Sequence, residues 1–185
     1  MIQFSGDGSL LQLQVISGLL LFIDPCYFDE IVSAQGRIAS FARTDTKIWL
    51  QQVEAEVFPY GGGSLLGMME LPDNREIYEL DIAKVTCYDE DEPHGEAIEQ
   101  MAKNKSITAF GIDAGSFLII DWANWDASLP VLCADDLFDL VDNPECGYIE
   151  KINKAIGNRG WAFVASPGVG SGIDFTGDGS YYIRD

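Results

Sequence analysis

The sequence has few basic residues and a single histidine. Against 30 Asp and Glu it holds 11 Lys and Arg, which gives a formal net charge of −19 over 185 residues, and the one histidine is His94. This excess of negative charge repels phosphate backbones and anionic lipid, so direct binding to nucleic acid or to a membrane surface is disfavoured. The same charge would steer a basic protein partner towards the acidic stretches 70–99 and 135–150.

The sequence also lacks a long apolar run and a basic leader. No stretch reaches the roughly 18 apolar residues that span a bilayer, and the start M-I-Q-F-S-G-D-G has no basic segment of a signal peptide. We therefore expect a cytoplasmic protein. The cysteines at 26, 87, 133 and 146 show no C-x-x-C spacing, which argues against a zinc ribbon or a thioredoxin-like pair and favours reduced thiols.

Two stretches of the chain repeat one pattern. Residues 15–28 read V-I-S-G-L-L-L-F-I-D-P-C-Y-F, and residues 112–125 read I-D-A-G-S-F-L-I-I-D-W-A-N-W. The glycine, the aspartate and the closing aromatic residue are offset by the same 97 positions, as in 121 − 24 = 97. Each stretch predicts a turn, a strand buried on both faces and a polar cap. A chain of this length forms one globular domain, here with two related halves of about 1–100 and 101–185.

Turn and cap signals predict the remaining elements. G-D-G-S occurs at 6–9 and at 177–180, and Asp-Gly between apolar segments is typical of a type I′ turn, so both chain ends are predicted to be hairpins. Helices are predicted from Asp24-Pro25 to Gly36 and from Asn143-Pro144 to Gly157-Asn158, with short helical turns at 95–102 and 134–141. Further strands are predicted at 37–43, 47–51, 54–58, 65–69, 76–85, 106–112, 117–120 and 161–165.

This order of elements predicts an α+β fold. The sheet is expected to be mostly antiparallel, arranged as a sandwich or as two packed sheets, with two to four short helices and an internal duplication.

Asp24 and Asp121 are weak candidates for catalytic residues. Both follow buried strands, where carboxylates often serve acid–base chemistry, but Asp24 precedes a proline and suits a helix N-cap, a role worth about 1 kcal/mol. Cys26 would then lie in the first helical turn, where the dipole favours a thiolate. A thiol nucleophile needs a base, and His94 lies in a distant acidic segment. An enzyme or small-ligand binder with a cleft between the halves, lined by Asp24, Cys26, Asp121 and Trp125, stays open as an alternative.

The C-terminal segment has the ligand spacing of a calcium loop. Asp174, Thr176, Asp178, Ser180 and Asp185 occupy positions 1, 3, 5, 7 and 12, with glycine at position 6. Helix signals are missing on both sides, which favours a hairpin turn. The ligand spacing still leaves a Ca²⁺-dependent structural module open as a second alternative. No other cofactor is predicted.

Trp122 and Trp125, in W-A-N-W after the second buried strand, are candidates for a ligand site or a protein interface. Filling of the core is the other explanation for both residues.

Two segments resemble bacterial proteins that carry a domain of unknown function with a C-terminal G-D-G-x-Y signature. They are the pattern from Gly18 to Phe28 and the closing G-D-G-S-Y-Y-I from Gly177 to Ile183. The resemblance implies no activity, cofactor or catalytic residue. Because the sequence offers a strong charge of one sign and no catalytic constellation, we expect a non-enzymatic acidic binding protein. Its partner would be a basic macromolecule, as for an inhibitor or an immunity-like protein.

Overall fold

The computed structural model describes residues 1–4, 10–40, 45–57, 66–71, 75–84, 107–112, 116–125, 128, 148–164 and 179–184. The helical elements are the 3-10 turn η1 (Pro25–Tyr27), α1 (Phe28–Ile38), α2 (Thr46–Val57), α6 (Tyr148–Ile156) and the 3-10 turn η3 (Gly157–Arg159). The strands are β1 (Ile2–Phe4), β2 (Leu10–Leu11), β3 (Leu19–Ile23), β4 (Leu66–Glu70), β5 (Tyr78–Lys84), β6 (Ile107–Ile112), β7 (Ser116–Asp121), β8 (Gly160–Val164) and β9 (Gly179–Arg184). None of these helices is long and apolar enough to cross a bilayer.

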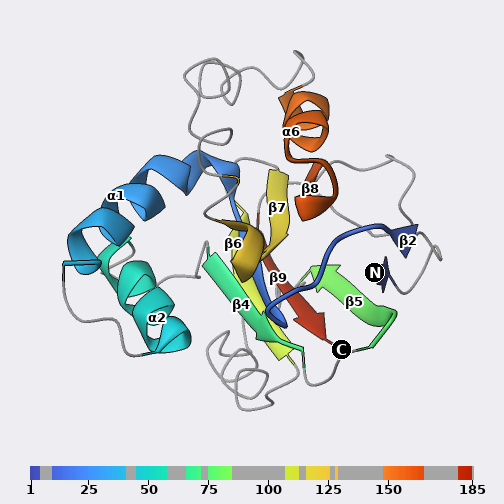
Figure 1. The fold of residues 1–185 in the computed structure, drawn as a ribbon, viewed down its shortest axis with the longest axis horizontal. Coiled ribbons are helices and arrows are strands. Elements are labelled where there is room, and N and C mark those ends of the chain that lie inside the picture. Colours follow the sequence, from blue (N-terminus) through green and yellow to red (C-terminus); the bar gives the residue numbers. More distant parts are fainter. Residues whose placement is uncertain are drawn as a thin grey trace, which may run out of the picture.

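The strands form two sheets. One sheet has the order β2-β1-β5-β9-β6, and the other has the order β4-β3-β7-β8. Every pairing between the described strands is antiparallel except that of β1 with β5. The mixture of helices with largely antiparallel sheet agrees with the fold class predicted from the sequence. Helices α1 and α2 lie side by side at one end of the molecule, and α6 lies next to β8 (Figure 1).

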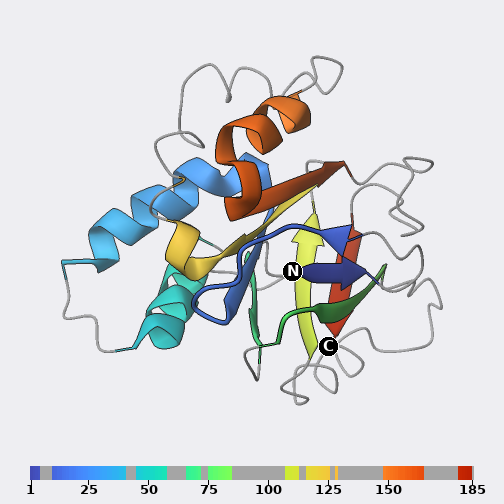
Figure 2. The same ribbon diagram turned by 45° about the vertical axis from the view of Figure 1, so that its right-hand side comes forward.

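Strand β3 lies in the middle of three layers. All five of its side chains are buried, and successive residues of a strand point to opposite faces. Leu20 and Phe22 pack into a core with Tyr181 of the other sheet. Leu21 and its alternating neighbours pack against the helices α1, α2 and α6. The sheet of β3 and β7 thus separates the helices from the sheet of β5 and β9, as Figure 2 shows.

The two repeated stretches become neighbouring strands. β3 and β7 pair antiparallel with Phe22 opposite Ile119, and these two residues are themselves 97 positions apart, since 119 − 22 = 97. On the outside, β4 pairs with β3 and β8 pairs with β7. A local two-fold axis that passes between Phe22 and Ile119 would produce this strand order.

The strands predicted at 47–51 and 54–58 are wrong, because α2 is helical from Thr46 to Val57. The strand predicted at 37–43 begins in the last residues of α1, and its residues 41–43 lie outside the described residues. α1 continues through Gly36 to Ile38, whose side chain is buried in the core, and that packing offsets the cost of about 1 kcal/mol for an exposed glycine inside a helix. α2 buries Trp49, Leu50 and Val53. Their spacing places them on one face of a helix, although their aromatic and β-branched side chains are typical of strands.

The two G-D-G-S segments have different outcomes. The first lies between β1 and β2, which pair with Ile2 opposite Leu11, so the predicted N-terminal hairpin is confirmed. The predicted C-terminal hairpin is wrong, because β9 pairs with β5 on one side and with β6 on the other. Tyr181 and Ile183 of β9 are completely buried, and this burial favours a central strand over an exposed local hairpin.

Candidate functional site

Asp121 ends β7 and is completely buried. Its Oδ2 accepts hydrogen bonds from the backbone N–H of Ile16 at 2.9 Å and of Ser17 at 3.0 Å. Its Oδ1 accepts from the Ser17 hydroxyl at 2.9 Å, from the Ser17 N–H at 3.1 Å and from the N–H of Ala123 at 2.8 Å. An ionised carboxylate only accepts hydrogen bonds, and both oxygens here already receive donors. The Asp121 carboxylate is therefore a structural anchor, because it holds the backbone of residues 16 and 17 at the end of β7.

The anchored segment is residues 12–18, here called the strap, which leads from β2 in one sheet to β3 in the other. Gln14 in the strap donates its N–H to the Asn158 carbonyl at 2.8 Å and accepts from the Asn124 side-chain amide at 3.4 Å. The strap ends at Gly18, whose φ of 73° lies in the left-handed region and whose carbonyl accepts from Leu71 N–H at 2.7 Å. The polar side chains at 121 and 124 therefore fix the connection between the two sheets.

Asp24 follows β3 directly and is also completely buried. In the antiparallel register Asp121 lies opposite Leu20, and Leu118 lies opposite Ile23, next to Asp24. Four residues of extended chain separate Leu20 from Asp24, which is about 13 Å along the strand. The two aspartates therefore lie at opposite ends of the strand pair, and the structure does not bring them together in one cleft.

The chain after Asp24 starts helical at Pro25, as predicted, but it first forms the 3-10 turn η1, in which the Tyr27 N–H donates to the Asp24 carbonyl at 3.1 Å. α1 begins only at Phe28 and receives no side-chain cap bond from its N-cap residue, Tyr27. Cys26 lies in η1, ahead of α1. Asp121 has cap geometry as well as its bonds to the strap, because its carboxylate accepts from Ala123, the second residue of the helical segment 122–125.

The other predicted polar sites fall largely outside the described residues. His94, Asp174, Thr176, Asp178 and Asp185 all lie there, so the structure places neither a Cys–His pair nor a complete calcium loop. Positions 6–11 of the predicted loop are strand β9, which contains Ser180 and is paired on both sides instead of curving around an ion. Within the described ranges, no group of three or more His, Cys, Asp and Glu residues could hold a metal.

The two candidate tryptophans pack against helices. Trp125 is 1% exposed, its ring lies 5.9 Å from that of Phe28, and its Nε1 donates to the Gln35 Oε1 at 3.1 Å. Trp122 is half-buried, and its ring lies 5.4 Å from that of Trp49 on α2. Burial closes Trp125 to a ligand, whereas Trp122 keeps some exposed surface.

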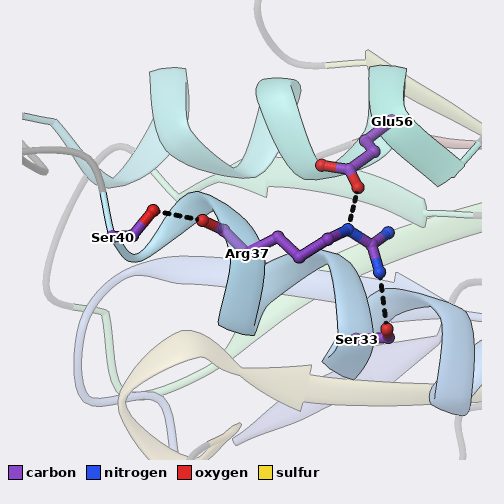
Figure 3. Close-up of polar contacts among 4 residues, drawn as sticks. All are labelled: Ser33, Arg37, Ser40 and Glu56. Atoms are coloured by element: carbon purple, nitrogen blue, oxygen red, sulfur yellow. Dashed lines mark hydrogen bonds and ion pairs between the residues drawn. The ribbon is translucent and has the colours of Figure 1, made fainter.

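Helices α1 and α2 form an open groove that was not predicted from the sequence, because strands were predicted at 47–51 and 54–58. The groove encloses about 380 Å³ and is lined by Asp29, Glu30, Ser33, Arg37, Glu56 and Val57, which together are called the α1–α2 groove. Figure 3 shows Arg37 of α1 paired with Glu56 of α2, while its Nη1 donates to Ser33 Oγ at 2.7 Å. The exposed side chains of Asp29 and Glu30 have no ion-pair or hydrogen-bond partner among the described residues.

No protein family, no curated protein and no solved structure matches the chain in comparisons of sequence and structure. The resemblance carried by residues 18–28 and 177–183 therefore assigns no family. The function has to be argued from the chain's own residues.

Proposed function

We propose that the chain is a non-enzymatic, cytoplasmic acidic binding protein that engages a basic macromolecular partner, in the manner of an inhibitor or an immunity-like protein. The observation that carries this proposal is the α1–α2 groove. Asp29 and Glu30 line it without partners among the described residues, whereas Glu56 already pairs with Arg37. A lysine or arginine of a partner would meet two carboxylates there without displacing an internal ion pair.

The charge distribution supports this proposal. The described residues hold 8 Lys and Arg and 12 Asp and Glu, a net of 8 − 12 = −4, so the remaining residues contribute −15 of the total −19. The groove would be one contact within a more extensive negative field. Such a field acts over a Debye length of about 8 Å at physiological ionic strength, and it accelerates association with a positively charged partner.

The two strand-end aspartates give little support to an enzymatic cleft between the halves. Both oxygens of Asp121 accept hydrogen bonds from the strap and from Ala123. Asp24 lies about 13 Å away along the strand pair. General acid–base catalysis needs groups that reach the same reacting atoms, and these two carboxylates do not converge.

Capture from a lysate of the source cell tests the proposal. The immobilised wild type should retain a basic protein at low salt and release it at high salt, with the protein identified by mass spectrometry. The variant D29N/E30Q should bind this protein more weakly than the control E76Q/E79Q, which removes the same number of charges from exposed positions of the acidic stretch 70–99 that do not line the groove. Equal weakening by both variants would show that the groove is not the contact. Retention of no protein at either salt would contradict the proposed function itself.

We also propose that the halves, about 1–100 and 101–185, arose by internal duplication. β3 and β7 are related by an offset of 97, and their outer neighbours β4 and β8 are both five residues long with an offset of 160 − 66 = 94. A helix precedes each outer strand, α2 before β4 and α6 before β8, and both helices pack into the same core cluster. The two offsets differ by 97 − 94 = 3, so the chain between β7 and β8 is three residues shorter in this alignment than the chain between β3 and β4.

A further inference from the structure

Arg37 places a cation of the chain itself inside the α1–α2 groove. Its Nε donates to Glu56 on α2, and its Nη1 donates at 2.7 Å to the hydroxyl of Ser33, one turn earlier on α1 (Figure 3). A guanidinium group carries five N–H donors in one plane, so one side chain can bond to both helices. All three residues line the groove.

The four charged residues of the groove form two groups. Arg37 and Glu56 are an ion pair whose charges cancel, whereas Asp29 and Glu30 have no ion-pair partner among the described residues. The groove therefore has a net charge of 1 − 3 = −2, although it holds three carboxylates. A partner's lysine or arginine can bind only two of them while the ion pair stays formed.

The ion pair lies at the surface of the molecule. The side chains of Arg37 and Glu56 are 59% and 34% exposed, and ion pairs with this exposure add little to the stability of a fold. Removal of Arg37 should therefore leave the two helices folded and leave the Glu56 carboxylate open to a cation from solution.

We infer that Arg37 limits the affinity of the groove for a basic partner, because it occupies the Glu56 carboxylate that a lysine or arginine of the partner would otherwise bind. This inference rests on the proposed function, in which the groove receives a basic side chain. Its consequence is that tight binding of a partner needs further contacts outside the groove.

Titration with N-acetylarginine amide tests the inference, because this probe carries one guanidinium group and no other charge. The backbone amide shifts of Glu30 and Ser33 in NMR spectra report binding at the groove rather than elsewhere on the acidic surface. R37M should bind the probe about 2- to 5-fold more tightly than wild type, which is the range for one exposed ion pair. R37M/E56Q should return to the wild-type affinity, because the groove again has a net charge of −2.

The matched control is K47M. Lys47 pairs with Glu70 at 3.1 Å, and the two side chains are 47% and 55% exposed, so K47M also removes one cation and frees one carboxylate. Lys47 does not line the groove, and it lies 56 − 47 = 9 residues before Glu56 in α2. That is about 13 Å along the helix axis, beyond the Debye length of about 8 Å at physiological ionic strength. K47M should therefore change the affinity for the probe less than about 1.5-fold.

Three results would overturn the inference: an R37M affinity equal to that of wild type, an equal gain in K47M, or a gain that persists in R37M/E56Q. Absence of any shift at Glu30 and Ser33 in all variants would overturn it as well. Capture of a basic protein from the lysate is a separate measurement, so the inference can fail while the proposed function stands. A gain confined to R37M would support the inference even if the lysate yields no partner.

Discussion

Replacing Gly160 by alanine should destabilise the protein, because the position has no room for a methyl group. Gly160 begins β8, where it pairs with Ile120 and lies under α6. A Cβ there would lie 2.9 Å from the Ile119 carbonyl oxygen, 3.1 Å from Ile156 Cδ1 and 3.2 Å from Ile120 Cβ. The φ of −160° is extended backbone that any residue adopts, so the cost is steric and not conformational.

The contacts set the size of the effect. Ile156 Cδ1 ends a flexible side chain and can move, whereas the Ile119 oxygen belongs to the backbone of β7 and can shift only with that strand. Overpacking of this kind costs about 1–3 kcal/mol, and we expect about 2 kcal/mol for G160A. In a chain of this size that corresponds to a fall in Tm of about 4–8 °C.

Gly36 is the matched control for the same chemical change. It lies exposed inside α1, and a Cβ built there meets no atom within 4 Å. G36A should therefore stabilise the protein by about 0.5–1 kcal/mol, because glycine inside a helix costs that much relative to alanine. Urea unfolding followed by tryptophan fluorescence measures both variants. Effects of the same sign, or a G160A variant as stable as wild type, would refute the packing of α6 over β7 and β8.

Three further substitutions test other contacts by the same unfolding assay. Q35M removes the acceptor of the buried Trp125 Nε1 and should cost about 1–3 kcal/mol; a loss that W125F does not reduce in a double-mutant cycle would contradict this hydrogen bond. R37M breaks the ion pair with Glu56, whose two side chains are 59% and 34% exposed, and should lower the free energy of unfolding by no more than about 1 kcal/mol. A larger loss would contradict the assignment of Arg37–Glu56 as an ordinary surface ion pair. G157A has open space but a φ of 59°, so it should lower stability by about 1 kcal/mol from backbone strain alone, and an unchanged Tm would contradict the left-handed end of α6.

The sequence predicts best the elements whose signals are local and agree with one another. β3 reads as five apolar residues between a glycine and Asp-Pro, and the structure has that strand with Gly18 in the left-handed region. α6 ends at Ile156, and the predicted terminating residue Gly157 follows it, again with positive φ. α2 was missed because isoleucine, tryptophan and valine favour strands, while the helical spacing of Trp49, Leu50 and Val53 is the stronger signal once the helix packs on a core.

The candidate site could be predicted only in part. The repeat identified Asp24 and Asp121 as equivalent positions, but the donors that surround Asp121 come from a segment 104 and 105 positions earlier, and no local pattern encodes such a contact. The α1–α2 groove needs two helices, of which only α1 was predicted. Strand β9 was predicted, but its central place in the sheet depends on partners far back in the sequence.

The position of β9 has a consequence for the order of folding. β9 is the last of the described strands in chain order, yet it joins β5 to β6, and its register pairs Tyr181 with Lys84 and with Phe110. The described strands of the β4-β3-β7-β8 sheet all precede residue 165, while the other sheet needs residues 179–184 to join β5 to β6. During synthesis on the ribosome, β5 and β6 would each present an unpaired edge until β9 emerges, a state that favours slow folding and association between nascent chains.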